Sequence, residues 1–275
     1  MHATKVHGAI GKVMQKTGLP LVFNPEKSKG SYLWDDLSGR KLLDFHTSFA
    51  SQPLSYKHPG FNSKFRKIMN KYAPYNPANP DILTSEKATF IESFFRVAMP
   101  VEFNHLYLVA GGTRAVEDAL KVAFDWKMRK GAKDENKLKV LHFKGAFHGR
   151  SGYCLSMTNT SDARKYMFYP KFDWPRVPFP DENNLEEDVK KHIVEIIKKQ
   201  GDEIAAICVE PIQCEGGDRH MSPEFWNFLR QITLDNEILL IADEVQTGYA
   251  IICLVLFLGF LCWLFAAGWQ NFSLS

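Results

Sequence analysis

From about residue 85 onward, apolar residues follow two alternating patterns. Short continuous apolar runs alternate with longer stretches in which apolar residues recur every three or four positions. The short runs predict buried strands, and the longer stretches predict amphipathic helices. The expected strands are 106–109, 139–143, 205–209 and 237–242, and the expected helices are 85–97, 115–126, 189–197 and 223–234. Because strands and helices alternate, we expect an α/β fold around a parallel sheet.

The N-terminal part has a different pattern. Residues 1 to about 30 are polar and are interrupted by glycine and proline. Two apolar runs, 31–34 and 41–45, flank the turn at 36–39 and predict a strand–turn–strand unit. Three prolines then mark an irregular connection before residue 81. We therefore expect an N-terminal segment and connection over residues 1–80, a larger domain over 81–248 and an apolar tail over 249–275.

The tail is apolar throughout. Residues 250–269 contain no charged or strongly polar side chain, and about 20 such residues suffice for a membrane-spanning helix. We therefore expect an apolar C-terminal helix, which is either a membrane anchor or the accidental product of a frameshift or misjoined gene model. We favour the second alternative, because the last basic residue is Arg230 and genuine spans have Lys or Arg close to their ends.

Composition narrows the function classes. The chain has 275 residues, of which 45% are hydrophobic and 24% charged, as in globular proteins. Its net charge is +3, and the basic residues are interspersed with acidic ones, which argues against a nucleic-acid partner. The five cysteines form no CxxC pair, so we expect no disulfide framework and no metal site. The first thirty residues contain no signal-peptide apolar core, and we expect a cytoplasmic protein up to residue 248.

Polar and glycine-rich motifs follow the expected strands. In an open parallel sheet, ligands bind beyond the carboxyl ends of the strands. Gly111-Gly112-Thr113 opens a helix, where free backbone N–H groups suit a phosphate, although such a sequence can also be a simple turn. In the motif Phe147-His148-Gly149-Arg150, Phe147 could stack on a planar cofactor and Arg150 could bind a carboxylate. Alternatively, Phe147 belongs to the core and Arg150 is a solvated surface charge.

Carboxylates follow the last two strands. Glu210 and Glu215 lie beside a glycine pair, and each could instead be a strand-end hydrogen-bond partner or a solvated loop residue. Asp243 directly follows an apolar run, so we expect it to be buried and to need a cationic partner. A protonated pyridine nitrogen or a structural salt bridge would each satisfy that need. Acidic strand ends also occur at magnesium sites, but no phosphate-binding lysine motif accompanies this one.

With these motifs in this order, the chain resembles the class III aminotransferases, which are fold type I pyridoxal-phosphate enzymes. The lysine 6-transaminase branch in particular is resembled by the stretches Gly111–Glu117, Gly145–Tyr153, Lys171–Arg176 and Glu210–Arg219. The resemblance covers roughly residues 10 to 248. It implies a partial large-domain parallel sheet that binds pyridoxal 5'-phosphate, preceded by an N-terminal segment of the small domain. It also implies homodimers with active sites at their interface.

The resemblance also implies residue roles. Gly112 and Thr113 would hold the cofactor phosphate, Phe147 would stack on the ring, Asp243 would pair with the ring nitrogen and Gln246 would contact the phenolic oxygen and the substrate. Arg150 would bind a substrate carboxylate. Glu215 would be the gate that lets one site accept both a terminal amine and a dicarboxylic acid. The implied reaction transfers the ε-amino group of L-lysine to 2-oxoglutarate, giving 2-aminoadipate 6-semialdehyde and glutamate.

The chain departs from the family after residue 248. The last lysine is Lys199, so no residue after Asp243 can form the Schiff base with the cofactor. We therefore expect the chain alone to have no significant transaminase activity. Two alternatives remain open. One is a non-catalytic module, tethered to a membrane through residues 250–269, that binds other molecules. The other is a class III ω-aminotransferase with a different amine donor.

Overall fold

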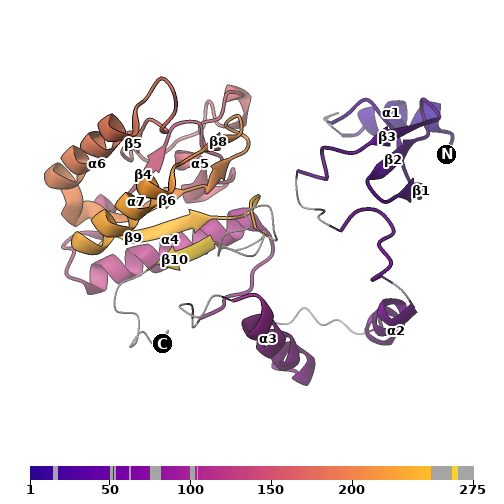
Figure 1. The fold of residues 1–275 in the computed structure, drawn as a ribbon, viewed down its shortest axis with the longest axis horizontal. Helices are drawn as coiled ribbons and strands as arrows, with labels where there is room; N and C mark the ends of the chain where they lie inside the picture. The colour runs from indigo at the N-terminus through magenta and orange to yellow at the C-terminus, as the bar shows by residue number, and fades with distance from the viewer. Residues whose placement is uncertain are drawn as a thin grey trace. The chain divides into compact units, whose positions relative to one another are not determined.

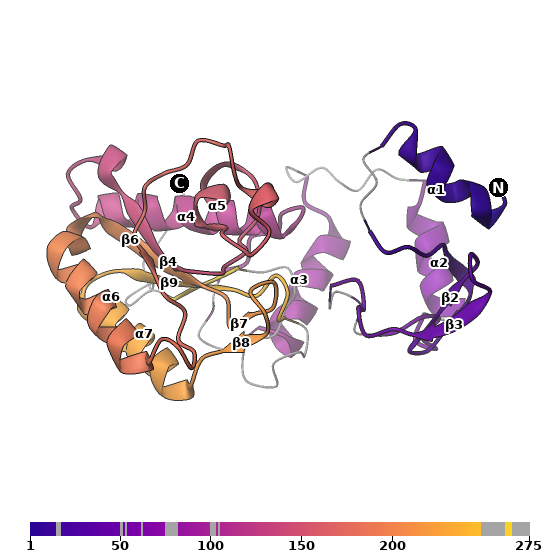
Figure 2. The same cartoon turned by 90° about the horizontal axis from the view of Figure 1, so that it is seen from above.

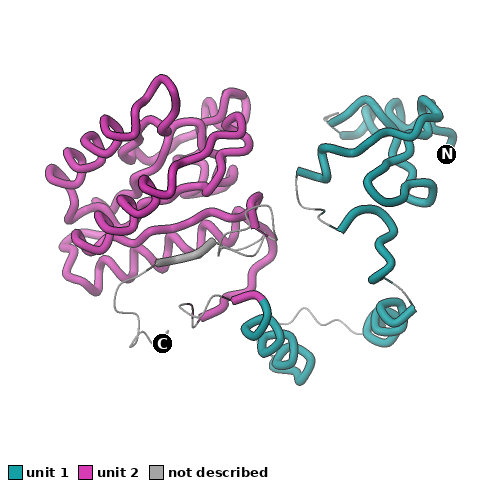
Figure 3. The backbone as a smooth tube through the Cα atoms, in the orientation of Figure 1, with its two compact units in different colours: residues 1–97 teal, residues 98–275 magenta. Residues whose placement is uncertain are grey.

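The structure is a computed structural model that describes residues 1–14, 18–49, 52, 54–61, 63–74, 82–99, 103 and 105–248, together with the backbone of 262–265. The chain divides into two compact units, Met1–Val97 and Ala98–Ser275 (Figure 3). All the motifs that the sequence places at strand ends belong to the second unit.

The first unit contains a small antiparallel sheet and three helices. The sheet has the order β1–β2–β3, and its strands are β1 (Phe23–Lys29), β2 (Tyr32–Asp35) and β3 (Arg40–Leu43). The predicted strand–turn–strand is confirmed, and Asp35 accepts hydrogen bonds from the backbone N–H groups of Leu37 and Ser38 within the turn. The helices are α1 (Ala3–Gly11), α2 (Ser63–Tyr72) and α3 (Ser85–Val97), of which only α3 has a buried residue, Phe94.

The second unit is built on a five-stranded sheet with the order β10–β9–β6–β4–β5. Strands β4 (Lys139–Phe143), β5 (Arg176–Val177), β6 (Ile204–Val209) and β9 (Leu239–Asp243) are parallel, as the alternation of strands and helices predicts. A separate short hairpin joins β7 (Ile212–Gln213) to β8 (Arg219–His220). The helices are α4 (Gly112–Arg129), α5 (Gly152–Met157), α6 (Glu186–Gln200) and α7 (Pro223–Asp235), with short 3₁₀ turns η1 (Glu135–Lys137), η2 (Ala163–Lys165) and η3 (Gly201–Glu203).

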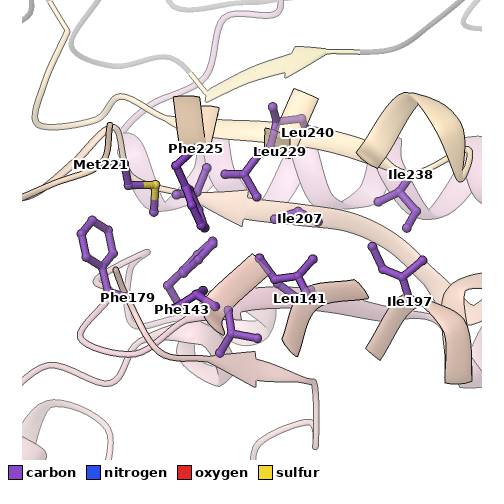
Figure 4. Close-up of a cluster of buried hydrophobic side chains, with 14 of the residues drawn as sticks. Leu141, Phe143, Phe179, Ile197, Ile207, Met221, Phe225, Leu229, Ile238 and Leu240 are labelled. Atoms are coloured by element: carbon purple, nitrogen blue, oxygen red, sulfur yellow. The ribbon is translucent and has the colours of Figure 1, made fainter. Parts of the chain in front are cut away.

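Helices cover both faces of this sheet, with α4 and α5 on one side and α6 and α7 on the other (Figures 1 and 2). Alternate strand residues point to opposite faces, so each strand contributes to two separate apolar clusters. One cluster joins Leu141 and Ile207 to α6 and α7 residues (Figure 4). The other joins Val140 and Cys208 to α4 and α5 residues. Strands buried on both faces explain why the sequence shows continuous apolar runs instead of alternation.

Helix α7 illustrates how the sequence sets an element boundary. Ser222 precedes Pro223, and its hydroxyl accepts a hydrogen bond of 3.0 Å from the backbone N–H of Phe225. A serine cap followed by proline is a strong start signal for a helix. The same hydroxyl donates to Glu186 Oε2 over 2.7 Å, so the starts of α6 and α7 are held together. Buried Phe225 and Leu229 then anchor α7 on the sheet.

Two sequence-based expectations about elements are wrong. Residues 106–109 form no strand, and Tyr107 and Leu108 are 69% and 48% exposed, because no neighbouring strand pairs with them in the described part of the chain. The apolar helix expected over 250–269 is wrong for the four of its residues that the structure describes. Cys262–Phe265 form strand β10, which pairs antiparallel with β9. An unpaired sheet edge offers backbone N–H and C=O groups that an extended segment can satisfy.

The remainder of the expected C-terminal helix lies outside the described residues. Among those that are described, no helix is both long and apolar enough to cross a membrane. The membrane-spanning expectation therefore has no support in the structure.

Candidate functional site

The carboxyl ends of β4, β6 and β9 lie side by side at one edge of the sheet. Val209 and Ala242 are paired across β6 and β9, so Glu210 and Asp243, the next residues in the chain, leave the sheet next to each other. The segment after β4 carries Phe147 and His148 to the same edge, since His148 contacts Asp243 directly. Three of the four motifs that the sequence singles out are thus brought together at this edge.

Asp243 is held by a buried histidine. Its Oδ2 lies 2.7 Å from Nδ1 of His148, and the two side chains are only 3% and 0% exposed. Its Oδ1 accepts a hydrogen bond of 3.1 Å from the backbone N–H of Val245. Burial lowers the pKa of His148, but the hydrogen bond and charge of Asp243, with a contribution from Glu210, outweigh burial and raise this pKa overall. His148 is therefore a buried partner of Asp243, as the salt-bridge alternative for this carboxylate predicts.

His148 is positioned by its own backbone. Its N–H donates to Thr158 Oγ1 over 3.0 Å, and the Thr158 hydroxyl donates to the carbonyl of Gly149 over 2.6 Å. All three residues are buried. The imidazole Nε2 is also buried and has no hydrogen-bond partner among the described residues. The position of the imidazole is thus set by its hydrogen bond to Asp243 and by the backbone hydrogen bonds around His148.

Glu210 links this pair to Phe147. Its Oε2 accepts a hydrogen bond of 3.1 Å from the backbone N–H of Phe147, and the residue is 6% exposed. Burial is the main reason why its pKa is raised to about 8, and Asp243 adds to the effect, whereas His148 and the Phe147 N–H oppose it. Near neutral pH, Glu210 is therefore mostly protonated. Its structural contribution is to fix the backbone that carries the Phe147 ring.

Two glycines allow the backbone segments to approach closely. A Cβ on Gly112 would lie 2.3 Å from Cγ1 of Val245, so the start of α4 packs directly on the turn that follows β9. A Cβ on Gly149 would lie 2.5 Å from Oγ1 of Thr113, and Gly149 has φ +112°, which favours glycine. These contacts place the glycine turn of the first motif beside the motifs that carry Phe147 and Asp243.

Glu215 lies at a more exposed position, on the turn between β7 and β8. Its Oε1 forms an ion pair with Lys165, and the two side chains are 30% and 27% exposed. The Lys165 ammonium also lies 5.6 Å from the centroid of the Phe147 ring. Glu215 is therefore connected to Phe147 through Lys165, a residue to which the sequence assigned no role.

Arg150 and Gln246 are less constrained. Arg150 is exposed, and Gln246 is half-buried in the turn after β9. Neither side chain forms a hydrogen bond with the described residues, and neither is brought into contact with the other predicted site residues. The binding roles of Arg150 and Gln246 stay predictions.

Sequence reasoning missed several residues that organise the site. Besides Lys165, these include Glu117 on α4, which accepts hydrogen bonds from the Ser151 hydroxyl and the Cys154 N–H, each over 3.1 Å, at the start of α5. Glu244 is fully buried, and neither of its carboxyl oxygens has a partner among the described residues. Of these residues, only Glu244 could have been singled out from the sequence, because it lies directly after an apolar strand and Asp243. No group of three or more metal-ligating side chains occurs in the part of the chain that is described.

Comparison with known proteins identifies the family. A model of the aminotransferase class-III family matches residues 13–251. The chain belongs to the class III aminotransferases. This family is pyridoxal-phosphate-dependent, so the α/β sheet and its strand-end motifs lie in an aminotransferase framework. The resemblance inferred from the motifs is confirmed at the level of the family.

The relatives that the chain matches are named for different amine donors. The chain is 41% identical over 259 residues to the L-lysine-epsilon aminotransferase of Mycobacterium tuberculosis, covering 89% of this chain and 58% of the relative. It is 34% identical to the human mitochondrial 4-aminobutyrate aminotransferase, covering 82% and 51%. A solved structure of lysine aminotransferase from M. tuberculosis matches with a TM-score of 0.84 and 40% identity, covering 91% and 61%. The chain thus spans less than two thirds of the length of these aminotransferases.

The described residues fit the family's flat, anionic cofactor. A buried carboxylate, Asp243, lies at the carboxyl end of β9, where a ring nitrogen could meet it. The first N–H groups of a helix have no partner inside the helix, and at α4 no described side chain caps them, since the residue before the helix is Gly111. The close approach of Gly112 to Val245 keeps this helix end beside Asp243. Both ends of the cofactor therefore have chemically matching groups at one edge of the sheet.

Proposed function

We propose that this chain carries the cofactor-binding part of a lysine ε-aminotransferase, which transfers the side-chain amine of L-lysine to 2-oxoglutarate and forms 2-aminoadipate 6-semialdehyde and glutamate. The observation that carries the proposal is the convergence of Asp243, Phe147 and the start of α4 at one edge of the sheet. The 41% identity to an L-lysine-epsilon aminotransferase supports the amine donor. Residues 81–248 would be an incomplete large domain, and residues 1–80 the N-terminal segment of the small domain.

Four groups would hold the cofactor. The backbone amides of Gly112 and Thr113 would bind its phosphate at the positive end of α4. The Phe147 ring would stack on the pyridine ring, at a position set by the hydrogen bond from its backbone to Glu210. Asp243 would pair with the ring nitrogen and keep it protonated, and the hydrogen bond with His148 would hold the Asp243 carboxylate in place. Gln246 would contact the phenolic oxygen.

Two residues would contact the substrates directly. Arg150 is exposed and would bind the substrate carboxylate farthest from the reacting carbon through its planar guanidinium. Glu215 would act as the gate between substrates, since a carboxylate repels a second carboxylate and attracts an amine. Gln246 would border the same space. The family works as homodimers with sites at the interface, and we propose the same assembly for this chain.

Pyridoxal phosphate, when bound, accepts the electron pair that is released at the carbon bearing the amine. The part of the chain that follows Asp243 contains no lysine that could take up the proton or bind the cofactor covalently; the last is Lys199. We therefore propose that the 275 residues alone have no significant transaminase activity. Their residues bind and orient the cofactor, and the proton transfer requires a group from elsewhere.

A second candidate is an aminotransferase with another ω-amine donor. The 34% identity to a 4-aminobutyrate aminotransferase supports it. Like L-lysine, 4-aminobutyrate carries a terminal amine and a carboxylate, so Arg150 and Glu215 could serve either donor. The two candidates differ in the distance between amine and carboxylate and in the second amino group, which only L-lysine carries.

A chimera tests both candidates. Residues 1–248 of this chain would be joined to the remaining C-terminal part of the M. tuberculosis lysine aminotransferase, and glutamate formation from 2-oxoglutarate would be measured with L-lysine, 4-aminobutyrate or ornithine. We expect L-lysine to be the best donor. The Asp243→Asn chimera should retain little activity, because the ring nitrogen loses its anionic partner. The 275-residue chain alone should form no glutamate.

Each possible result of these assays tests a different part of the proposal. A chimera that prefers 4-aminobutyrate supports the second candidate and contradicts the first. Glutamate formation by the 275-residue chain alone contradicts the proposed inactivity. Full activity of the Asp243→Asn chimera contradicts the role of Asp243. Binding of pyridoxal phosphate to the 275-residue chain, followed by its phosphorus NMR signal, would check the cofactor site independently of turnover.

A further inference from the structure

Lys165 lies between two of the predicted site residues. Its ammonium forms an ion pair with Oε1 of Glu215 and lies 5.6 Å from the centroid of the Phe147 ring. A cation at this distance from an aromatic ring is attracted to the ring's negative face. The lysine is half-buried, so its charge is directed toward these two groups and only partly toward solvent.

The backbone that carries Lys165 is locally fixed. Lys165 ends the 3₁₀ turn η2, and its N–H donates to the carbonyl of Asp162 over 3.1 Å. The Asp162 side chain begins this turn by accepting the Arg164 N–H over 3.2 Å. Aspartate is a common cap at such positions. The ammonium therefore extends from a defined turn instead of from an irregular loop.

The backbone that carries Glu215 is also tightly packed. A Cβ on the neighbouring Gly216 would lie 2.8 Å from the carbonyl oxygen of Gly145, so these two backbone segments are in direct contact. Gln213 Nε2 donates to the carbonyl of Lys144 over 3.0 Å and ties the same two segments together. Because Phe147 follows Gly145 closely in sequence, Glu215, Phe147 and Lys165 form one small assembly.

The negative charge of Glu215, the proposed gate, would hinder binding of a dicarboxylic acceptor, and Lys165 can offset that charge. The same space must accept an amine donor with one terminal carboxylate and an acceptor with two carboxylates. An ionised Glu215 would repel the second carboxylate of the acceptor. A partner cation removes most of that repulsion, and the observed pair is exposed enough to open when another cation takes its place.

We infer that Lys165 is a specificity-determining residue that neutralises Glu215 while a dicarboxylic acceptor is bound. When an ω-amine donor is bound, the pair is not needed and can open. This inference rests on the proposed function, because it assigns a partner to the gate in the same site. It concerns charge balance only and assigns Lys165 no covalent role.

Two probes without a keto group test the inference on the full 275-residue chain loaded with pyridoxamine 5'-phosphate, the amine form of the cofactor, which reacts with neither probe. Glutarate has a carboxylate at each end, and 5-aminopentanoate has the same number of carbons with an ammonium at one end. Calorimetry would measure both dissociation constants for wild type, Lys165→Met, Lys165→Arg and Glu215→Gln. Arg164→Met is the matched control, because it removes one positive charge from the same turn, where the exposed guanidinium pairs with Asp162 and with no other carboxylate among the described residues.

Lys165→Met should weaken glutarate binding about tenfold, the size of one lost charge-assisted contact. It should change 5-aminopentanoate binding by less than about twofold, or tighten it. Lys165→Arg and Arg164→Met should leave both constants within about twofold of wild type. Adding Glu215→Gln to Lys165→Met should restore glutarate binding to within about twofold of wild type, because the uncompensated negative charge is then gone. A purely structural lysine would not show this dependence on the charge of Glu215.

Other outcomes overturn the inference. If Lys165→Met weakens both probes equally, or if adding Glu215→Gln does not restore glutarate binding to Lys165→Met, Lys165 supports the loop without setting specificity. If the wild-type chain binds both probes and Lys165→Met changes neither, the inference alone is wrong. If wild type binds neither probe, the inference fails as well, and the chimera assay then shows whether the proposed function fails with it.

Discussion

The two ends of the candidate site are stabilised by different interactions. At the cofactor end, the side chains of His148 and Asp243 are 0% and 3% exposed and lie 2.7 Å apart. At the substrate end, Lys165 and Glu215 keep 27% and 30% of their side chains exposed. Opening the first pair would leave a charge in apolar surroundings, whereas opening the second lets water replace the lost contact. The cofactor end is therefore part of the core, and the substrate end is not.

This difference has a functional consequence. We expect substitutions at the substrate end of the proposed site to change which amine is accepted without unfolding the sheet, and substitutions at the cofactor end to affect folding and chemistry together. The relatives fit this division, since proteins named for lysine and for 4-aminobutyrate share one family with this chain.

The largest expected effect is at the buried pair. His148→Ala should lower the free energy of unfolding of the 275-residue chain by about 3–5 kcal/mol, because Asp243 stays buried without its partner. Folding raises the pKa of His148 above 6.5, so its charge stabilises the fold fully below about pH 6.5 and less as pH rises through the folded value. The loss, measured by urea denaturation, should therefore be greatest at low pH.

His142→Ala is the control for His148→Ala. His142 is equally buried, but burial and the nearby Arg176 lower its pKa to about 3, so it is neutral. Replacing its side chain leaves a cavity of similar size, but no buried carboxylate loses its partner. We expect His142→Ala to cost less, and its cost to shrink as pH falls from about 6.5 to 5, because the unfolded chain protonates this histidine there and the folded chain does not. This is the opposite of the pH dependence expected for His148→Ala. Equal losses for the two variants would mean that volume, and not charge, determines the role of His148.

The contacts that sequence analysis could not predict are those between distant residues. The α/β class, the parallel strands at 139–143 and 205–209 and the buried Asp243 follow from local apolar patterns, and the structure confirms them. His148 and Asp243 are 95 residues apart, and Lys165 and Glu215 are 50 apart. No local pattern encodes such pairs, since the path of the chain determines them. Residues 106–109 failed as a strand for the same reason, because apolar character does not supply a neighbouring strand.

A second, smaller effect on the free energy of unfolding is expected at Glu244, next to Asp243. Burial, aided by the charge of Asp243, raises its pKa from 4.5 to about 8. The folded chain thus keeps a proton between about pH 4.5 and 8 that the unfolded chain has released, so stability must fall as pH rises through this window. Glu244→Gln should remove this part of the slope, at most about 1.4 kcal/mol per pH unit for one group. Urea denaturation at pH 5 and pH 8.5 would measure it.

Two details sharpen the Glu244 experiment. Glu210, whose pKa is also about 8, contributes a slope of the same sign, so the Glu244→Gln variant should become flatter but not flat. The exposed Glu195 provides a control, and Glu195→Gln should leave the wild-type slope unchanged. If Glu244→Gln and wild type lose stability in parallel between the two pH values, Glu244 is ionised in the folded chain and has found a partner.

The smallest expected effect on stability is at Arg150, on the exposed end of the site. Its guanidinium forms no hydrogen bond with the described residues, so Arg150→Gln should change the free energy of unfolding by less than about 0.5 kcal/mol. Binding should respond instead. Glutarate and 5-aminopentanoate both carry a carboxylate, and we expect each to bind about tenfold more weakly to the variant.

Arg150→Lys should recover part of this binding, because it keeps the charge but loses the planar two-point contact. Arg164→Gln, at another exposed arginine, should affect neither probe. A loss of more than about 1 kcal/mol in stability for Arg150→Gln would place Arg150 in the folded framework and remove the contrast between the two ends. Unchanged binding of both probes would contradict its role as the carboxylate site. A loss shared by both probes at Arg150, set against a loss confined to glutarate at Lys165, would separate the residue that anchors every substrate from the residue that selects among them.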